Sequence, residues 1–235
     1  MKRITLVMLI SILVVFSEQS YAQKADYVFK SGDVNGIGKW YMGREIAYVM
    51  GFQGINWLER SEREEEEKTS KLIKNMRISA TDVIADIGAG SGYHVFKMAP
   101  LAKEGIVYAV DIQPEMLMAI DVKKDTEKVS NVITIQGAEQ TVNLPENSID
   151  KILMVDVYHE FSYPKEMLTS IYSALKPNGQ IYLIEYRGED ASVPIKRLHK
   201  MTEAQAVREF KASGFDLKEN IDNLPWQHCM VFVKE

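Results

Sequence analysis

The stretch between Asp82 and Asp111 limits the possible folds of this chain more than any other. A short apolar run from Val83 closes on the acid Asp86, and three alternate glycines follow it. A segment of helical length comes next, and a second apolar run, 106–110, ends on Asp111. Strand, glycine turn, helix and strand in this order predict a βαβ unit with a nucleotide-binding turn after its first strand.

The spacing of the glycines argues against a dinucleotide cofactor. Gly88, Gly90 and Gly92 follow the pattern G-x-G-x-G, whereas a dinucleotide-binding turn uses G-x-G-x-x-G and would need a glycine at Tyr93. A dinucleotide also places its pyrophosphate at a helix N-terminus, where the amide dipoles favour anions. A tight turn without a ligand is the alternative, but three glycines between two strand-terminal acids favour a binding site.

From Asp82 onward the chain alternates between strand and helix patterns. The expected strands are Val83–Asp86, Ile106–Val110, Val132–Gln136, Ile149–Val155, Gly179–Tyr186, Phe215–Glu219 and Cys229–Val233. The expected helices are Gly92–Leu101, Pro114–Lys124, Pro164–Ala174 and Thr202–Ser213, and a charged helix precedes them at Ser61–Met76. This alternation, with a hairpin across 222–225 at its end, predicts a doubly wound α/β fold.

The turn Asp86-x-Gly-x-Gly-x-Gly, followed by Asp111 at the next strand end, resembles the class I S-adenosylmethionine (SAM) methyltransferases. Leu175-Lys176-Pro177-Asn178-Gly179 is similar to the turn of that family before its fifth strand, with asparagine in place of a glycine. The resemblance covers roughly Lys71 to Glu235 and is closest to the small-molecule and quinone-biosynthesis branch. It implies a mostly parallel, Rossmann-like sheet of seven strands with an antiparallel last strand, an N-terminal helical extension and SAM as cofactor.

The resemblance also suggests which residues contact the cofactor. Asp86 suits the ammonium group of SAM, Asp111 its ribose hydroxyls, and Ala138 with Glu139 its adenine, while Asp156 is expected on the cofactor side of the active site. The complete expected set is Asp86, Gly88, Ala89, Gly90, Gly92, Asp111, Ile112, Ala138, Glu139 and Asp156.

The segment 156–161 follows the fourth strand, where the family places the reacting edge of the cofactor. His159 is of a residue type that can accept a proton from an acceptor, and Tyr158 could orient the acceptor. The alternative is that both side chains only cover the edge of the sheet. His159, His199 and His228 could form a metal site, but their spacing matches no metal-binding motif, so no metal is predicted.

The first 22 residues have the three parts of a secretory signal peptide. Lys2 and Arg3 make a positive start, residues 4–16 are almost wholly apolar, and Ser20-Tyr21-Ala22 is a small-x-small cleavage site. We therefore expect an exported protein, periplasmic in a Gram-negative cell, with no membrane span after cleavage; an uncleaved anchor is the alternative. Residues 23–78 then form an extension or lid, and residues 79–235 the SAM-binding domain.

The extension resembles that of a group of bacterial methyltransferases of unassigned substrate, through segments 43–51, 57–60 and 63–66. In the class I fold such an extension covers the cofactor and shapes the acceptor pocket. Trp57, Arg60 and Arg63 could then meet the substrate or the SAM carboxylate. They could equally pack the lid and pair with neighbouring glutamates.

These observations predict a SAM-dependent methyltransferase that acts on a small-molecule or lipid-like acceptor. The net charge of −5, without a basic run, argues against a nucleic-acid partner. A non-catalytic SAM-binding module or sensor is an alternative, because SAM is made in the cytoplasm while the chain carries an export signal. A nucleotide-dependent oxidoreductase is a third hypothesis, disfavoured by Tyr93. The sequence predicts neither the acceptor nor the oligomeric state.

Overall fold

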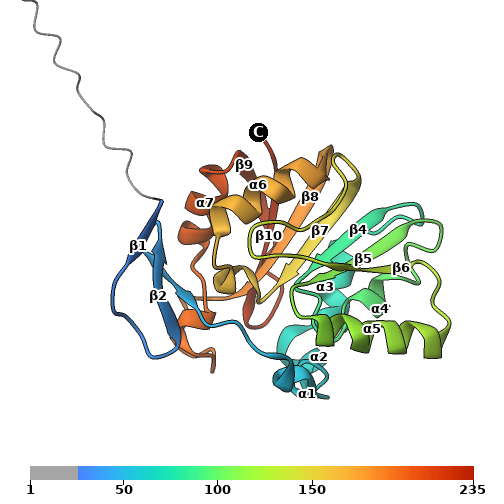
Figure 1. The fold of residues 1–235 in the computed structure, drawn as a ribbon, viewed down its shortest axis with the longest axis horizontal. Helices are drawn as coiled ribbons and strands as arrows, with labels where there is room; N and C mark the ends of the chain where they lie inside the picture. The colour runs from blue at the N-terminus through green and yellow to red at the C-terminus, as the bar shows by residue number, and fades with distance from the viewer. Residues whose placement is uncertain (1–25) are drawn as a thin grey trace, which may run out of the picture.

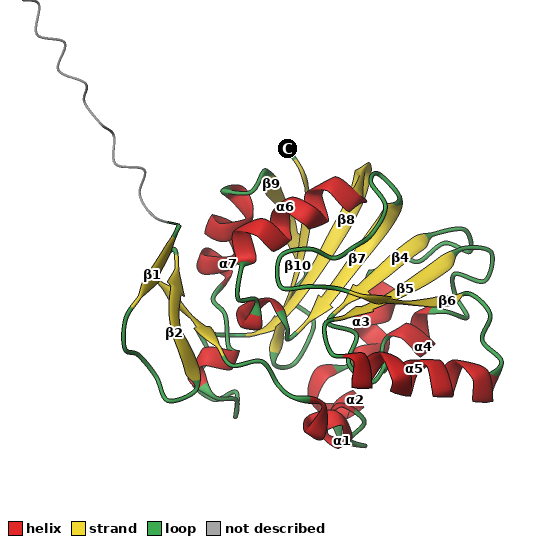
Figure 2. Ribbon diagram, viewed as in Figure 1, coloured by secondary structure: helices red, strands yellow, loops and turns green. Residues whose placement is uncertain are grey.

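The computed structural model describes residues 26–235 and consists of a large mixed sheet with helices on both faces and a small sheet at its side (Figure 1 and Figure 2). The predicted signal peptide, 1–22, lies outside the described residues. Within residues 26–235, no helix has both the length and the apolar character that crossing a bilayer requires.

The large sheet is formed by β4 (Val83–Ile87), β5 (Ile106–Asp111), β6 (Val132–Gln136), β7 (Ile149–Val155), β8 (Leu175–Tyr186), β9 (Phe215–Asn220) and β10 (Gln227–Lys234). The helices around it are α3 (Thr69–Asn75), α4 (Val95–Met98), α5 (Pro114–Glu127), α6 (Pro164–Ala174) and α7 (Glu203–Lys211). The extension contains β1 (Tyr27–Phe29), β2 (Gly36–Tyr41), β3 (Arg44–Ala47), α1 (Ile55–Leu58) and α2 (Arg63–Glu67). Three 3₁₀ helices complete the described chain: η1 (Phe52–Gly54), η2 (Tyr158–Glu160) and η3 (Arg197–His199).

The seven-stranded sheet confirms the predicted fold class. Its strand order is β6-β5-β4-β7-β8-β10-β9, with β4 to β8 parallel and β10 antiparallel to both of its neighbours. The chain winds outward from β4 in one direction and then from β7 in the other. The carboxyl ends of β4 and β7 therefore lie side by side at the switch point, where open α/β sheets bind ligands.

Strand residues alternate between two cores because successive side chains point to opposite faces of the sheet. On β7, Ile152 and Met154 belong to the core under α6 and α7, whereas Leu153 belongs to the core under α3, α4 and α5. Both faces are thus covered by helices, as a mostly parallel sheet requires. Leu72 of α3 and Met76, which follows the helix directly, pack into the second core, although both precede residue 79, where the predicted SAM-binding domain begins.

Two expected helices differ from the structure. The expected helix Gly92–Leu101 contains only the short α4, and Gly92, at a φ of +80°, still belongs to the glycine turn. The prediction of a single helix over Ser61–Met76 is wrong. The chain has a break at Lys68, which has a φ of +54° and separates the end of α2 from the start of α3.

The extension includes an antiparallel sheet, β1-β2-β3, that the sequence analysis did not predict in addition to its helices. The turn between β2 and β3 places Met42 and Gly43 at positive φ, the geometry of a tight hairpin. Arg44 on β3 then binds the buried carboxylate of Glu209 on α7 through two hydrogen bonds of 2.9 Å. This bidentate pair fixes the extension against the carboxyl edge of the large sheet.

Candidate functional site

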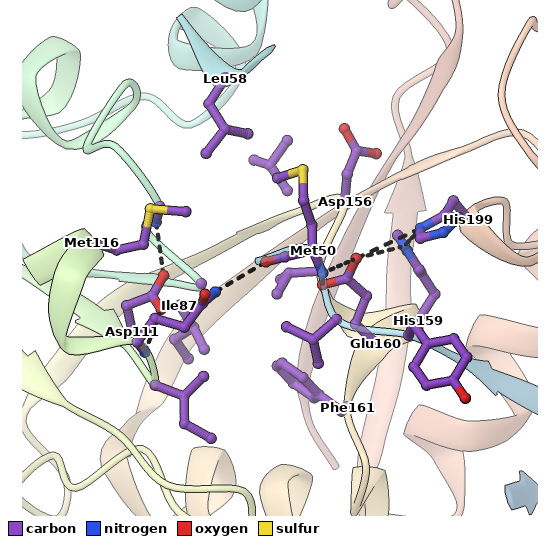
Figure 3. A pocket seen from close by; sticks show the side chains of 18 of the residues that line it. Met50, Leu58, Ile87, Asp111, Met116, Asp156, His159, Glu160, Phe161 and His199 are labelled. Atoms are coloured by element: carbon purple, nitrogen blue, oxygen red, sulfur yellow. Dashed lines mark hydrogen bonds and ion pairs between the residues drawn. The ribbon is translucent and has the colours of Figure 1, made fainter. Parts of the chain in front are cut away.

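A cavity of about 680 Å³ lies at the carboxyl ends of β4, β5 and β7, between the sheet and the extension (Figure 3). Eight of the sequence-predicted site residues line it: Gly88, Gly90, Asp111, Ile112, Ala138, Glu139, Asp156 and His159. The volume falls within the range of ordinary small-molecule sites. The switch point of the sheet therefore carries the ligand cavity that the strand order predicts.

The glycine turn brings bare backbone to the wall of this cavity. Gly88 and Gly90 have φ of +73° and +54°, in the region that only glycine adopts easily. A Cβ atom on Gly88 would lie 2.4 Å from the Val157 side chain, and one on Gly90 would lie 2.6 Å from Leu58. Both positions therefore need glycine for backbone geometry and for space.

Asp111 is held by the backbone on both of its carboxylate oxygens. Its Oδ2 accepts a 2.9 Å hydrogen bond from the N–H of Gly90, and its Oδ1 accepts one of 2.9 Å from Gln113. Burial raises the pKa of Asp111, and these backbone donors oppose the rise. Because each carboxylate oxygen has a second lone pair, this fixed carboxylate can still accept hydrogen bonds from a ligand in the cavity.

Asp86, near the end of β4, is buried and does not line the cavity. Its Oδ2 atom has no hydrogen-bond partner within the described residues. Burial raises the pKa of Asp86 to about 7, with Arg63 opposing the rise and Asp111 adding to it. A buried carboxylate of this kind becomes more stable when a cationic group approaches it.

Asp156, directly after β7, has strained backbone geometry and lines the cavity. Its φ is +50°, an uncommon value outside glycine that often marks functional sites. Gln227 donates a 2.7 Å hydrogen bond to Oδ2, while Oδ1 is buried without a partner in the described chain. Burial raises the pKa of Asp156 well above its usual value, and the neighbouring Glu67 and Glu185 add to this effect.

Four of the twelve predicted site residues do not line the cavity: Asp86, Ala89, Gly92 and Tyr158. Ala89 and Gly92 belong to the turn but face the packed interior, where a Cβ on Gly92 would meet Phe96 and Ile120. The structure does not support the expected role of Tyr158. Its side chain is fully buried, its ring packs against Phe210 and its hydroxyl donates a 2.8 Å hydrogen bond to Glu209. Tyr158 therefore supports the segment after β7 and is not positioned to orient an acceptor.

His159 is held firmly at the opposite end of the cavity. Its Nδ1 donates a 2.6 Å hydrogen bond to the fully buried carboxylate of Glu185 on β8. Burial lowers the pKa of His159, but the negative charge of Glu185 more than offsets this, so the net pKa is raised. With Nδ1 occupied by Glu185, the Nε2 atom is directed to its other neighbours, His199 and Glu160.

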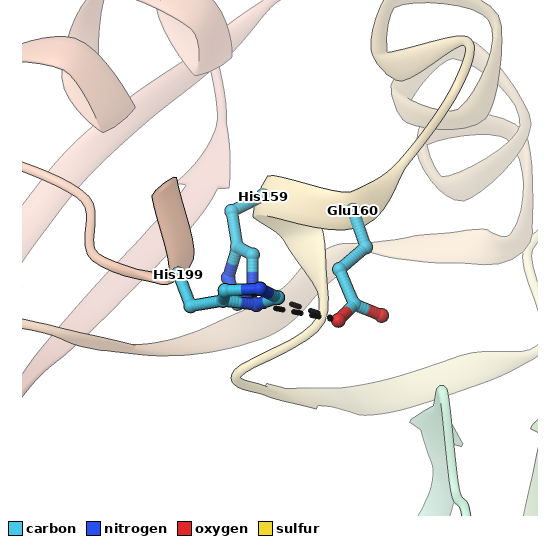
Figure 4. A group of neighbouring side chains, drawn as sticks. All are labelled: His159, Glu160 and His199. Atoms are coloured by element: carbon cyan, nitrogen blue, oxygen red, sulfur yellow. Dashed lines mark hydrogen bonds and ion pairs between the residues drawn. The ribbon is translucent and has the colours of Figure 1, made fainter. Parts of the chain in front are cut away.

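The structure brings His159, Glu160 and His199 together, a cluster that the sequence spacing did not predict (Figure 4). The Nε2 atom of His159 lies 3.0 Å from Nδ1 of His199, and Oε1 of Glu160 lies within 3.8 Å of both nitrogens. All three side chains line the cavity. The sequence could not reveal this cluster because His199 lies on η3, forty positions along the chain from His159.

The extension contributes to both ends of the cavity. The N–H of Met50 lies 3.2 Å from both carboxylate oxygens of Glu160, and its carbonyl accepts a hydrogen bond from the Gln113 side chain (Figure 3). Gln113 also accepts a 2.8 Å hydrogen bond from the N–H of Phe52. Gln113 was not predicted as a site residue, although it follows the predicted Asp111 and Ile112 directly.

The arginines of the extension pair with glutamates, as one of the two sequence interpretations expected. Arg60 and Arg63 each bind the buried Glu67, at 2.6 and 2.7 Å. The Arg60 guanidinium also lies 3.8 Å from the ring centroid of Trp57. These residues line the cavity, so the pairing does not remove them from contact with a ligand.

Comparison with known proteins gives the family of the chain. A solved SAM-dependent methyltransferase from Aquifex aeolicus superposes with a TM-score of 0.74 over 78% of this chain and 98% of that one, at 21% identity, and shares the fold. Residues 85–183 match a family profile described as a methyltransferase domain. An uncharacterized methyltransferase, YdaC, of Bacillus subtilis (strain 168) is 31% identical over 145 residues, 61% of this chain and 77% of that protein.

The chain belongs to the class I SAM-dependent methyltransferases. This methyltransferase is also 26% identical, over 105 residues, to a ubiquinone/menaquinone biosynthesis C-methyltransferase of Wigglesworthia glossinidia brevipalpis. That match spans 44% of this chain and 42% of the relative. Family membership identifies SAM as the cofactor, as predicted from the glycine turn.

The site of this methyltransferase fits SAM on its own geometry. SAM carries a sulfonium and an ammonium group. Two buried carboxylate oxygens lack partners among the described residues: Oδ1 of Asp156, which lines the cavity, and Oδ2 of Asp86, which is buried and does not line it. Gly88 and Gly90 line the cavity without side chains, so their backbone is available to a cofactor there. Asp111 presents a carboxylate already fixed in orientation by two backbone donors.

Proposed function

We propose that this methyltransferase transfers the methyl group of SAM to a small-molecule or lipid-like acceptor that binds in the same cavity. The observation that supports this most is the extent of the cavity, which runs from the glycine turn to His199. Most of the wall between these ends is apolar: Ile87, Val110, Met116, Val142, Val155, Phe161 and Met167. Such a wall suits the hydrocarbon or aromatic body of an acceptor.

The rim of the cavity includes several exposed apolar side chains. Val34, Tyr48, Val49 and Trp57 line it with exposed fractions of 89%, 57%, 48% and 48%. Exposed apolar groups gathered around a cavity commonly mark a binding surface. They favour an acceptor with an apolar part that extends beyond the cavity, and this is the reason to include lipid-like compounds.

The two ends of the cavity have different roles in this proposal. The cofactor end comprises the glycine turn, Asp86, Asp111, Ile112, Ala138, Glu139 and Asp156. The acceptor end comprises Met50, His159, Glu160, Phe161 and His199. At the cofactor end, Asp111 binds the ribose hydroxyls, Ala138 and Glu139 contact the adenine, and Asp86 with Asp156 stabilises the positive charge of the methionine part.

When bound, SAM supplies an electrophilic methyl group. The residues of the chain position the acceptor against it and exclude water, which are the main contributions that a protein can make to such a displacement. His159 lies at the acceptor end and is a group there that can take a proton from a hydroxyl or thiol. Its orientation is set by Glu185, which binds the opposite ring nitrogen.

We also propose that the protein works outside the cytoplasm, guided by the predicted signal peptide. The support is the pattern of residues 1–22 alone, which lie outside the described part of the chain. Expression of the full chain with a C-terminal tag, followed by fractionation, would test this. Export predicts a shortened chain starting at Gln23 in the envelope fraction, and a full-length cytoplasmic protein would refute it.

Transfer of a labelled methyl group from SAM tests the acceptor class. The protein would be incubated with labelled SAM and three sets of acceptors: apolar phenols, quinols and thiols; lipid extracts; and tRNA with unfolded protein. Label in the first or second set supports the proposal. Label only in tRNA or protein would overturn the acceptor class while leaving the methyltransferase assignment intact.

A further inference from the structure

We propose that His159, Glu160 and His199 form a binding site for a divalent transition-metal ion of the zinc type, with an open coordination position that faces the cavity. The three donor atoms are Nε2 of His159, Nδ1 of His199 and a carboxylate oxygen of Glu160 (Figure 4). The side chains approach from η2 and η3, and their polar ends converge on one point.

The distances between the donor atoms match the size of such an ion. They are 3.0 Å between the two nitrogens, 3.8 Å from Glu160 Oε1 to His159 and 3.6 Å from the same oxygen to His199. The point equidistant from the three atoms then lies about 2.0 Å from each, the bond length of zinc to imidazole and carboxylate. An ion close to this plane would be within bonding distance of all three donors, and small shifts of the side chains would bring them to the three ligand positions of a tetrahedron.

The surroundings of the cluster are those of a metal site. Glu185, which is fully buried, accepts from Nδ1 of His159, so that Nε2 faces His199 and Glu160 and can coordinate an ion between them. A carboxylate behind a ligating imidazole is the usual partner of histidine in metal sites. The N–H of Met50 orients the Glu160 carboxylate from the other side.

The donor set also selects the class of metal. Two imidazoles and one carboxylate suit zinc, iron, cobalt and related ions, whereas magnesium and calcium prefer oxygen ligands alone. Three protein ligands leave a fourth position open, as in catalytic rather than structural zinc sites. Because all three ligands line the cavity, that position is accessible to a compound bound there.

A role for the metal in the reaction rests on the proposed function, whereas metal binding does not. An acceptor oxygen or sulfur bound at the open position would lose its proton more easily, because coordination lowers the pKa of the bound group. His159 would then act as a ligand, and the proton of the acceptor would pass to solvent water. The acceptor oxygen or sulfur would bond to the methyl carbon of SAM while the carbon–sulfonium bond breaks, so that S-adenosylhomocysteine is released. The acceptor would belong to the hydroxyl or thiol compounds rather than the carbon acids.

Calorimetric titration of the metal-free protein with zinc chloride tests the site directly. The protein would be freed of metal with a chelator, and binding of S-adenosylhomocysteine would confirm in parallel that it is folded. We expect one zinc ion per chain. His199→Ala and Glu160→Gln should each weaken zinc binding by about 100-fold or more, and Glu185→Gln by about 10–100-fold, as expected for a carboxylate behind a ligand.

His228→Gln is the matched control, because His228 also pairs with a glutamate, Glu189, but does not line the cavity. It should bind zinc as the wild type does. Cobalt gives an independent readout, since its visible absorption should appear in the wild type and disappear in His199→Ala. The metal site is refuted if the wild type binds no zinc, or if His199→Ala retains it. Unchanged binding of S-adenosylhomocysteine in that case would leave the proposed function standing.

Discussion

The cofactor end and the acceptor end of the cavity are built in different ways. At the cofactor end, Gly88, Gly90 and Asp111 come from one continuous βαβ unit, and backbone hydrogen bonds hold them in place. At the acceptor end, Met50, His159 and His199 come from the extension and two separate 3₁₀ helices. The first end depends on local backbone geometry, whereas the second depends on side chains that only the complete fold brings together.

The largest effect is expected from a side chain at the most restricted position of the cofactor end. In Gly88→Ala, the new Cβ atom would lie 2.4 Å from the Val157 side chain. The alanine would also have to adopt the φ of +73° that Gly88 has. The left-handed conformation costs about 1–2 kcal/mol and the overpacking about 1–3 kcal/mol. We expect a loss of about 2–5 kcal/mol in the free energy of unfolding, measured by urea denaturation.

Gly43→Ala is the control for this substitution, because Gly43 also has a positive φ, +92°, but has open space around it. Apart from its chain neighbours, no atom of the described residues lies within 4 Å of a Cβ placed there. It should show only the conformational cost of about 1–2 kcal/mol. Equal losses in the two variants would mean that Val157 moves aside freely. The packing around the glycine turn would then be less rigid than we expect.

The two ends also differ in how far the sequence predicted them. The strand positions, the glycine turn and Asp111 follow from apolar runs and a motif within about thirty residues, so local patterns were sufficient, whereas the seven-stranded sheet with its antiparallel last strand was inferred from the family resemblance. The broken helix at Lys68 and the β1-β2-β3 sheet were not predicted, because their apolar residues show no clear period. Glu160 and His199 meet only through the path of the chain between β8 and η3, which no spacing rule describes.

Tyr158 shows the same limit from the opposite side. Its place after the fourth strand suggested a role in the active site, but side-chain direction decides such a role, and its ring points into the core against Phe210. A sequence position at the end of a parallel strand indicates proximity to the site. It does not indicate which of two neighbouring residues, Tyr158 or His159, faces the cavity.

The next largest effect concerns cofactor affinity. Asp111→Ala removes the proposed contact to the ribose hydroxyls, and also the acceptor of the Gly90 N–H. Loss of hydrogen bonds to a charged group should weaken binding of S-adenosylhomocysteine by about 1.5–3 kcal/mol, measured by calorimetry. Asp125→Ala, at the far end of α5, should leave the affinity unchanged. If Asp111→Ala binds normally, the ribose assignment is wrong.

The pH dependence of the same affinity tests Asp86. Its pKa is about 7 in the ligand-free protein because of burial, and the ammonium group of the ligand should favour the ionised form. Binding should therefore weaken as the pH falls, by about tenfold between pH 8 and pH 6. Asp86→Asn should abolish most of this dependence. A wild-type affinity that does not vary with pH would place the ammonium group elsewhere.

The raised pKa of Asp86 also makes the stability of the ligand-free protein depend on pH, in the opposite direction to the affinity for the ligand. Folding raises the pKa of Asp86, so the folded chain holds a proton that the unfolded chain has already released. This group therefore makes the protein less stable as the pH rises from about 4 to about 7. Asp86→Asn should remove this contribution, which urea denaturation at pH 5 and pH 8 would measure.

The smallest effect is expected where the two ends are connected. The Gln113 side chain binds the carbonyl of Met50 and the N–H of Phe52, and so ties the extension to the end of β5. Gln113→Ala should cost about 1–2 kcal/mol, since two hydrogen bonds of a partly exposed segment are lost. Faster hydrogen exchange should appear at residues 50–52, with the glycine turn unaffected. Because Met50 also orients Glu160, the affinity for zinc should fall, whereas the affinity for S-adenosylhomocysteine should change little. Equal losses of both affinities would show that the two ends of the cavity do not act independently.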